Sequence, residues 1–258
     1  MLSVFAMLPA IRLVKAEPGT IRVPTDYGTI QAAIDTANTG DTIYVYAETY
    51  YEHVVVNKAV SLIGENKGIT VIDGSGTGSA IGISHASNVT VSGFTISNSG
   101  TEASGIYLFY ASYCTIIGNN IINHSTGVSV WSSNHNILTG NTITNNDKGL
   151  DVSNFSDVNE IVGNTIASNY GYGIYLDTAG NNSIYHNNFW NNTNQVYVYN
   201  SVNFWDKGYP SGGNYWSDYN GTDGNGDGIG DSPYVISEGI QDNYPLMNPW
   251  ESGSTRYP

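Results

Sequence analysis

A repeat of 22 to 25 residues fills positions 89–205 and restricts the fold more than any other feature of the chain. Each copy reads apolar, any, Gly, Asn, any, Ile, and a second glycine then opens another short apolar strand. The first marker recurs at Gly93, Gly118, Gly140 and Gly163, with His186 in the last copy. The second recurs at Gly105, Gly127, Gly149 and Gly173, with Gln195 in the last copy. Five aligned copies predict a repeat architecture.

The strands within each copy are too short to bury a face alone. Successive copies must therefore stack to form a continuous core, as the rungs of a parallel β-helix do. We predict an all-β solenoid of seven or so rungs, about 4.8 Å apart, with a glycine at each tight corner. An asparagine column follows the first corner, and we interpret it as structural, with amides bonded from rung to rung, rather than as a ligand set. Its members are Asn119, Asn141, Asn164 and Asn187.

Upstream of the repeat, residues 29–37 predict a short amphipathic helix, because Ile30, Ala33, Ile34 and Ala37 share one face. This helix would plug one end of the solenoid, and the strands would begin at residues 42–45. We divide the chain into a possible signal-like segment (1–16), an N-terminal cap with the first rungs (17–60), the β-helix (61–205) and a C-terminal cap (206–258).

Composition and the N-terminal segment limit the partners and the location of the chain. The formal charge is −14, from 8 basic and 22 acidic residues, which disfavours nucleic acid and anionic membranes as partners. No stretch is long and apolar enough to span a bilayer. Residues 1–16 resemble the end of a secretory signal, so we expect an extracellular, periplasmic or cell-surface location. Cys114 is predicted to be a small packed residue, and six sequons allow surface glycosylation: Asn88, Asn123, Asn154, Asn181, Asn191 and Asn220.

After the last rung lies a loop rich in aspartate and glycine, with the spacing of a calcium loop. Alternate oxygen-bearing side chains, a glycine for the turn and a backbone carbonyl suit a hard cation. The twelfth position is Tyr234, where an EF-hand has a bidentate glutamate, and Asp218 and Asp242 are candidate additional ligands. The alternative is a turn cluster that needs no ion. The predicted Ca²⁺ ligands are Asp223, Asn225, Asp227, Ile229 and Asp231.

The third strand of each copy carries outward-pointing aromatic side chains. Rows of exposed aromatic rings on a rigid sheet are suited to stacking against sugar rings, although aromatic residues are also simply common on strands. We therefore predict a glycan-binding face. Its candidate residues are Tyr107, Phe109, Trp131, Tyr175, Tyr197 and Tyr199.

Two aspartates share that face. Asp151 and Asp177 lie one rung and two residues apart, a separation of roughly 8 Å, which is typical of the acid and base of an inverting glycosidase. Both are also explained as solvated surface carboxylates. Lys148 is the only basic residue between positions 89 and 205, so a neutral glycan is a better expected ligand than a polyuronate.

The chain resembles the right-handed parallel β-helix proteins of the pectin-lyase-like superfamily, and more closely the NosD-like group of periplasmic and archaeal cell-surface proteins. The motifs that carry the resemblance are the Gly-Asn-x-Ile rungs and residues 29–34, 40–43, 51–52, 62–65, 214–219 and 242–246. The resemblance implies a single-stranded right-handed solenoid. It also implies three functional possibilities: carbohydrate binding, polysaccharide cleavage, and copper delivery to nitrous oxide reductase.

Copper is the poorest fit of the three. The rungs hold one cysteine, no methionine and scattered histidines, among which we interpret His124 and His186 as solvated positions. The aspartate and arginine pattern of pectin esterases is not completed, so no catalytic residue is carried over.

Three hypotheses remain open. The first is a calcium-stabilised, exported β-helix that binds glycan or serves as a surface structural module without turnover. The second is a glycoside hydrolase or other polysaccharide-active enzyme that uses Asp151 and Asp177. The third is a subunit that associates end to end through an open terminal rung into a surface layer or filament.

Overall fold

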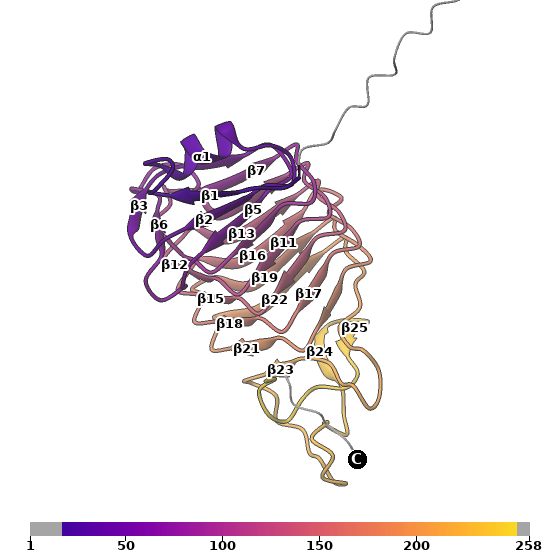
Figure 1. Ribbon diagram of the computed structural model, residues 1–258. Coiled ribbons are helices and arrows are strands. Elements are labelled where there is room, and N and C mark those ends of the chain that lie inside the picture. The colour runs from indigo at the N-terminus through magenta and orange to yellow at the C-terminus, as the bar shows by residue number, and fades with distance from the viewer. Residues whose placement is uncertain (1–16, 252–258) are drawn as a thin grey trace, which may run out of the picture.

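The computed structural model describes residues 17–251, which form a right-handed parallel β-helix of about nine turns (Figure 1). The predicted fold class is confirmed. The predicted seven or so rungs were too few, because turns at both ends of the solenoid depart from the repeat. The signal-like segment 1–16 lies outside the described residues.

Three parallel sheets, here named A, B and C, run the length of the solenoid. In spatial order, sheet A contains β1 (Thr20–Val23), β2 (Thr42–Val45), β5 (Ser61–Gly64), β8 (Thr90–Ser92), β11 (Thr115–Ile117), β14 (Ile137–Thr139), β17 (Glu160–Val162) and β20 (Ser183–Tyr185). Sheet B contains β3 (Thr49–Tyr51), β6 (Val71–Asp73), β9 (Thr95–Ser97), β12 (Asn120–Ile122), β15 (Thr142–Thr144), β18 (Thr165–Ala167), β21 (Asn188–Trp190) and β23 (Tyr215–Trp216). Sheet C contains β4 (Val54–Val56), β7 (Ile81–Ser84), β10 (Ser104–Phe109), β13 (Thr126–Trp131), β16 (Lys148–Ser153), β19 (Tyr172–Asp177) and β22 (Asn194–Tyr199).

The register of the strands places equivalent residues of successive copies directly over one another. In sheet C one inward column is buried through four strands, and its fifth member, Val196, is half-buried. Burial alternates along each strand because successive side chains point to opposite faces, so one set fills the core and the other faces solvent. The column consists of Ile106, Val128, Leu150, Ile174 and Val196.

The N-terminal end is closed by a helix, as predicted. Helix α1 (Ile30–Thr36) packs on strands β1, β2 and β4, and Thr29 caps its first turn. The side-chain amide of Gln31 accepts a hydrogen bond from Val55 N and donates one to Val55 O, so it occupies the edge of sheet C as a further strand would. Strand β1 precedes this helix and was missed, since we expected the strands to begin at residue 42.

The opposite end is covered by the C-terminal cap. Trp216 stacks between Phe189 of the last rung and Tyr234 of the antiparallel hairpin β24 (Tyr234–Ser237) and β25 (Ile240–Asp242). Strand β22 ends sheet C and, within residues 17–251, pairs only with β19. End-to-end self-association stays a prediction from the sequence. In the described part of the chain, the helix present is too short and polar to cross a bilayer.

The predicted asparagine column is a hydrogen-bonded ladder. The Oδ1 atom of Asn164 accepts bonds from the backbone N and the Nδ2 of Asn141, each at 3.0 Å, and its Nδ2 donates to Leu138 O. The interpretation as structural amides bonded from rung to rung is therefore confirmed. Asn214 extends the ladder beyond the last copy, and Asp242 ends it.

Two further ladders at the other corners were missed. One consists of Asn136, Asn159, Asn182 and Asn203, and the other of Asn146, Asn169 and Asn192. His124 leads the second of these ladders, and its backbone N donates to Asn146. In the regular rungs, all three kinds of corner are therefore held by mostly buried amides, which satisfy backbone groups that the sharp turns leave unpaired.

The prediction that His124 is solvated was wrong. Its ring is buried, with Nδ1 2.8 Å from Ser99 Oγ and Nε2 3.0 Å from Ile96 O. Burial lowers the pKa of His124 to about 4, so the ring is neutral at physiological pH. His186 is also buried and stacks on Trp250, because the C-terminal segment folds back over its corner.

Candidate functional site

A groove of about 500 Å³ lies over the outer face of sheet C. Strands β10, β13 and β16 supply Tyr107, Trp131 and Asp151 to it, and the turn before β10 adds Glu102. These residues follow one another across neighbouring strands because Tyr107, Ser129 and Asp151 are in register. The groove thus combines aromatic surfaces, hydroxyls and carboxylates on a rigid sheet.

The six predicted aromatic residues do not form one uniform row. Trp131 is 40% exposed and Tyr107 is half-buried, and both line the groove. Phe109 stands beside Tyr107, with ring centroids 5.6 Å apart. Burial raises the pKa of Tyr107, which keeps its hydroxyl protonated.

Beyond the groove, the aromatic ring of Tyr175 is covered by neighbouring side chains. Tyr175 stacks on Tyr197 at 4.6 Å between centroids, and Lys148 Nζ lies 3.9 Å from the centre of the Tyr175 ring. Since Lys148 and Tyr197 come from the strands on either side of Tyr175, both faces of its ring are occupied. Tyr199 at the edge is 53% exposed. The aromatic surface open to a ligand is therefore concentrated around Trp131 and Tyr107, with Tyr199 separate from it.

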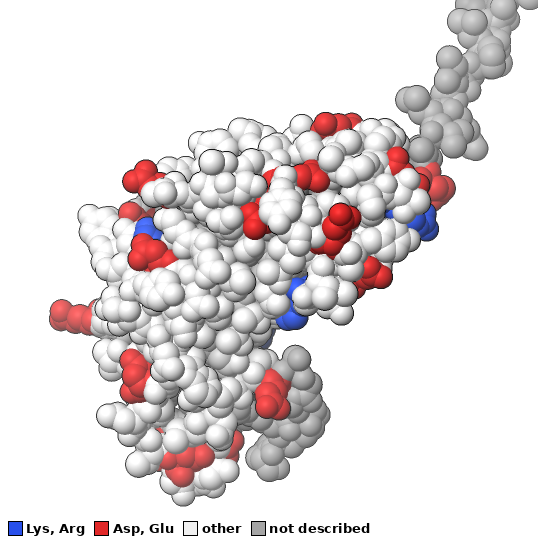
Figure 2. Space-filling model, turned by 90° about the vertical axis from the view of Figure 1, so that its left-hand side faces the viewer, with Lys and Arg blue, Asp and Glu red and all other residues white. Residues whose placement is uncertain are grey.

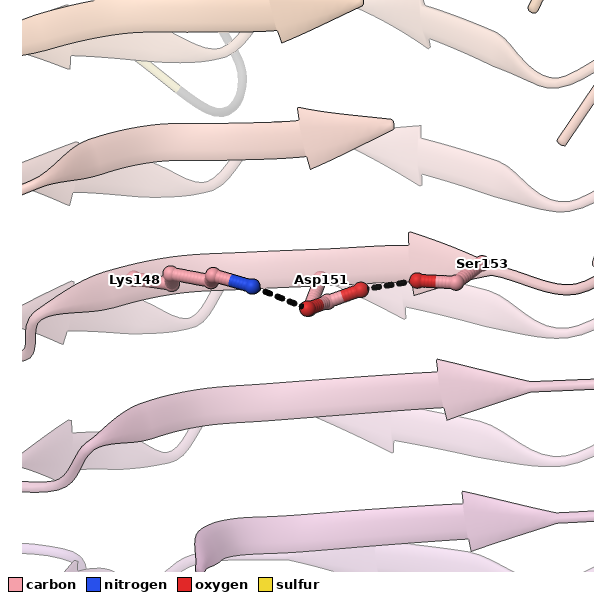
Figure 3. A network of polar contacts seen from close by, with 3 residues as sticks. All are labelled: Lys148, Asp151 and Ser153. Carbon is pink, nitrogen blue, oxygen red and sulfur yellow. Dashed lines mark hydrogen bonds and ion pairs between the residues drawn. The ribbon is translucent and has the colours of Figure 1, made fainter. Parts of the chain in front are cut away.

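The polar centre of the site is a network on strand β16 (Figure 3). Lys148 Nζ donates to Asp151 Oδ2 at 2.7 Å, and Ser153 Oγ donates to Asp151 Oδ1. Both oxygens of the carboxylate therefore accept a hydrogen bond from the same strand. Ser153 is buried next to Asp151, although it stands in register with the exposed Trp131 of the preceding strand.

The two candidate catalytic aspartates are not brought into one site. The register pairs Asp151 with Tyr175 and Ser153 with Asp177, so the carboxylates are one strand and two residues apart, as expected. Asp151 lines the groove, whereas Asp177 lies outside its lining and accepts a hydrogen bond from Thr178 Oγ1 at 2.9 Å. Catalysis by this pair stays a prediction.

In the acidic loop of residues 223–231, the carboxylates bind backbone amides. Asp223 accepts bonds from the N atoms of Gly226, Asp227 and Gly228. The backbone bond from Ile229 lowers the pKa of Asp227, and the side chain of Ile229 is buried. Asp231 accepts a bond from Gly224 N at 2.8 Å. This arrangement agrees with the turn-cluster alternative and lends the Ca²⁺ prediction no support of its own.

The two candidate additional ligands are engaged elsewhere. Asp218 accepts a hydrogen bond from the hydroxyl of Tyr234, and Asp242 is fully buried at the end of the first asparagine ladder. Across residues 17–251, no three His, Cys, Asp or Glu side chains gather into a group that could hold a metal ion.

Two charged groove residues, Glu102 and Lys148, were not among the sequence-based candidates. Glu102 lies in a turn and has no place in the repeat pattern, so the sequence offered no signal for it. Lys148 was noted only as the one basic residue of the rungs, and that rarity was the available signal. Figure 2 shows acidic side chains spread over one side of the molecule with few basic ones among them.

Solved structures and curated relatives bear on the fold and the family. An alginate lyase from Paenibacillus sp. is similar in structure with a TM-score of 0.55, covering 76% of this chain and 80% of its own, and at 15% identity it shows the fold alone. A probable ABC transporter binding protein NosD from Pseudomonas aeruginosa is 36% identical over 142 residues, 54% of this chain and 30% of that protein. Its counterpart from Stutzerimonas stutzeri is 31% identical over 139 residues, 53% of this chain and 29% of that protein.

The chain thus spans about 30% of the length of these curated relatives. Residues 28–221 match the family model described as "Periplasmic copper-binding protein (NosD)". The periplasmic location of that family confirms the expected location outside the cytoplasm. With most of the solenoid matched, the chain belongs to the NosD family.

Proposed function

We propose that this chain is a glycan-binding module that holds a polysaccharide in the groove over sheet C without turning it over. One observation carries the proposal: exposed Trp131 and half-buried Tyr107 line the same groove as Asp151 and Ser129. Aromatic rings give apolar surface against which sugar rings stack, and nearby carboxylates and hydroxyls accept or donate hydrogen bonds to sugar hydroxyls. The parallel sheet holds these groups in fixed positions, so little ordering is needed on binding.

Replacing Trp131 by alanine is expected to weaken glycan binding by about 2 kcal/mol, or roughly 30-fold in Kd. The binding partner is first identified on a glycan array and the Kd is then measured by calorimetry. Trp190→Ala is a matched control, because Trp190 is 42% exposed but lies on sheet B. Equal losses in the two variants, or no loss in either, would place the binding site elsewhere.

Polysaccharide cleavage is the rival function. It would need Asp151 and Asp177 to act on one bond, yet only Asp151 lines the groove, and both of its oxygens accept hydrogen bonds from β16. Release of reducing ends from a bound glycan, abolished by Asp177→Asn, would favour the enzyme over the binding module.

Within residues 17–251, no three His, Cys, Asp or Glu side chains form a group that could hold a metal ion, so the structure gives copper handling no support. Each ring nitrogen of His53 and of His124 has a protein partner, and Cys114 is fully buried. Burial raises the pKa of the Cys114 thiol, which disfavours the thiolate that copper would bind. We therefore propose no copper-dependent function for this chain.

Calcium binding by the acidic loop is a separate part of the proposal. A carboxylate oxygen that accepts an amide hydrogen bond retains a further lone pair, so Asp223, Asp227 and Asp231 could share their oxygens with an ion. At a Ca²⁺ concentration 100 times the Kd, binding would stabilise the folded chain by about 2.7 kcal/mol, which corresponds to a rise in Tm of several degrees. Melting curves in CaCl₂ and in EDTA provide the test. Superimposable curves would leave the loop as a turn cluster.

A further inference from the structure

We infer that the groove over sheet C selects neutral glycans and rejects polyuronates, and that the Lys148–Asp151 ion pair sets this selectivity. The inference rests on the proposed glycan-binding function and specifies the chemistry of its ligand. It assigns a particular role to two side chains: Asp151 occupies the one ammonium group that could otherwise hold a sugar carboxylate.

Lys148 is the only cation among the residues that line the groove. Its Nζ is 2.7 Å from Asp151 Oδ2 and 3.9 Å from the centre of the Tyr175 ring, so it is engaged on two sides. The side chains of Lys148 and Asp151 are only 28% and 16% exposed, and a partly buried pair is screened less by solvent than a surface pair. A uronate carboxylate would have to displace an internal carboxylate that is already in place.

The remaining charges oppose an anionic ligand. Glu102 and Asp151 together carry two negative charges against the single positive charge of Lys148, so the groove as a whole is negative. Each uronate residue that entered would lose hydration without gaining a free cationic partner, and its charge would be repelled. Sugar hydroxyls meet no such cost, because they can donate to carboxylates and stack their ring faces on Trp131.

Ser153 holds Asp151 in the orientation that maintains this state. Its hydroxyl donates to Asp151 Oδ1 from the side opposite Lys148, and Figure 3 shows the carboxylate lying between the two along β16. The carboxylate is therefore fixed at both oxygens and does not turn away from Lys148 to admit another anion.

The test replaces Asp151 by asparagine, which keeps the size of the side chain and removes its charge. With Lys148 released, the variant is expected to bind an oligogalacturonate hexamer roughly tenfold or more tightly than the wild type, since a hydrogen bond between charged groups contributes more than one between neutral groups. That new binding should weaken with added salt, whereas binding of a neutral hexamer should not. Asp35→Asn on α1 is the control for the same change in net charge away from the groove.

The outcomes separate the two proposals. Wild-type protein that binds the uronate hexamer as tightly as neutral glycans, or Asp151→Asn protein that gains no uronate binding while retaining its wild-type Tm, would overturn the selectivity inference and leave glycan binding intact. No binding to any glycan on an array that includes neutral and uronate polymers would instead remove the proposed function, and the inference with it.

Discussion

Replacing Asn164 by alanine is expected to lower the free energy of unfolding by about 3–5 kcal/mol, a large share of the stability of a typical domain. Asn164 is fully buried. Its Oδ1 atom satisfies two groups of Asn141, and its Nδ2 satisfies Leu138 O. Alanine would remove the partner of Asn141 N and the amide bond to Leu138 O, and it would remove one of the two bonds of Asn141 Nδ2, whose other bond goes to Ile116 O. Each polar group left unpaired inside the core costs about 1–3 kcal/mol. Urea denaturation followed by circular dichroism measures the change.

Asn57→Ala is the matched control for this experiment, because Asn57 is exposed in the turn after β4. It is expected to alter stability by no more than about 0.5 kcal/mol. An Asn164→Ala protein as stable as this control would mean that the ladders do not hold the corners, and that the aliphatic columns alone maintain the stacking of the rungs.

The solenoid could be predicted from the sequence because its period is a physical repeat length. Each turn of chain must return to the same face, so residues such as Ile121 and Ile143 recur at the spacing of one rung and lie in register. The two missed ladders carry the same signal, since Asn146 and Asn169 also recur at one turn. His124 was wrongly predicted to be solvated because the contacts of its ring are visible only in the structure. The ring takes the place of an asparagine amide and bonds to Ser99 and Ile96 of the preceding rung.

The site could be predicted only in outline. The alternation of inward and outward side chains along the strands identified the outward face of sheet C, and Tyr107 and Trp131 do line a groove there. It could not show that Lys148 covers the ring of Tyr175, because that contact depends on side-chain packing between neighbouring strands. The acidic loop shows a different limit, since the same alternation of aspartate and glycine serves either an ion or a set of backbone amides.

Replacing Asp242 by alanine is also expected to destabilise the protein by about 3–5 kcal/mol. The carboxylate is fully buried and accepts hydrogen bonds from Asn214 N, Trp216 Nε1 and Tyr244 N. It therefore ends the first asparagine ladder and joins it to the C-terminal cap, which explains why the segment 242–246 was among the motifs that carry the family resemblance. Alanine would leave these three donors unpaired. Thermal and urea unfolding would both report the loss.

Asp242→Asn shows how the charge itself contributes, through the dependence of stability on pH. Burial raises the pKa of Asp242 to about 6, although the hydrogen bonds that it accepts act in the opposite direction. Because the pKa in the unfolded chain is about 3.9, the folded state holds this proton more tightly. The associated stability is complete below about pH 4 and is lost as the pH rises through about 6. A shift of two pKa units corresponds to about 3 kcal/mol.

The difference in unfolding free energy between wild type and Asp242→Asn should therefore change by about 2 kcal/mol between pH 4 and pH 7, with the wild type relatively more stable at pH 4. Carboxylates that do not interact with Asp242 titrate alike in both proteins, so their effects cancel in this difference. That includes Asp41, whose pKa is lowered by hydrogen bonds from Gly19 and Asn38 and whose contribution has the opposite sign. A difference that stays constant with pH would mean that the pKa of Asp242 is the same in the folded and unfolded states. In that case the hydrogen bonds from the three donors would fully offset the effect of burial on this pKa.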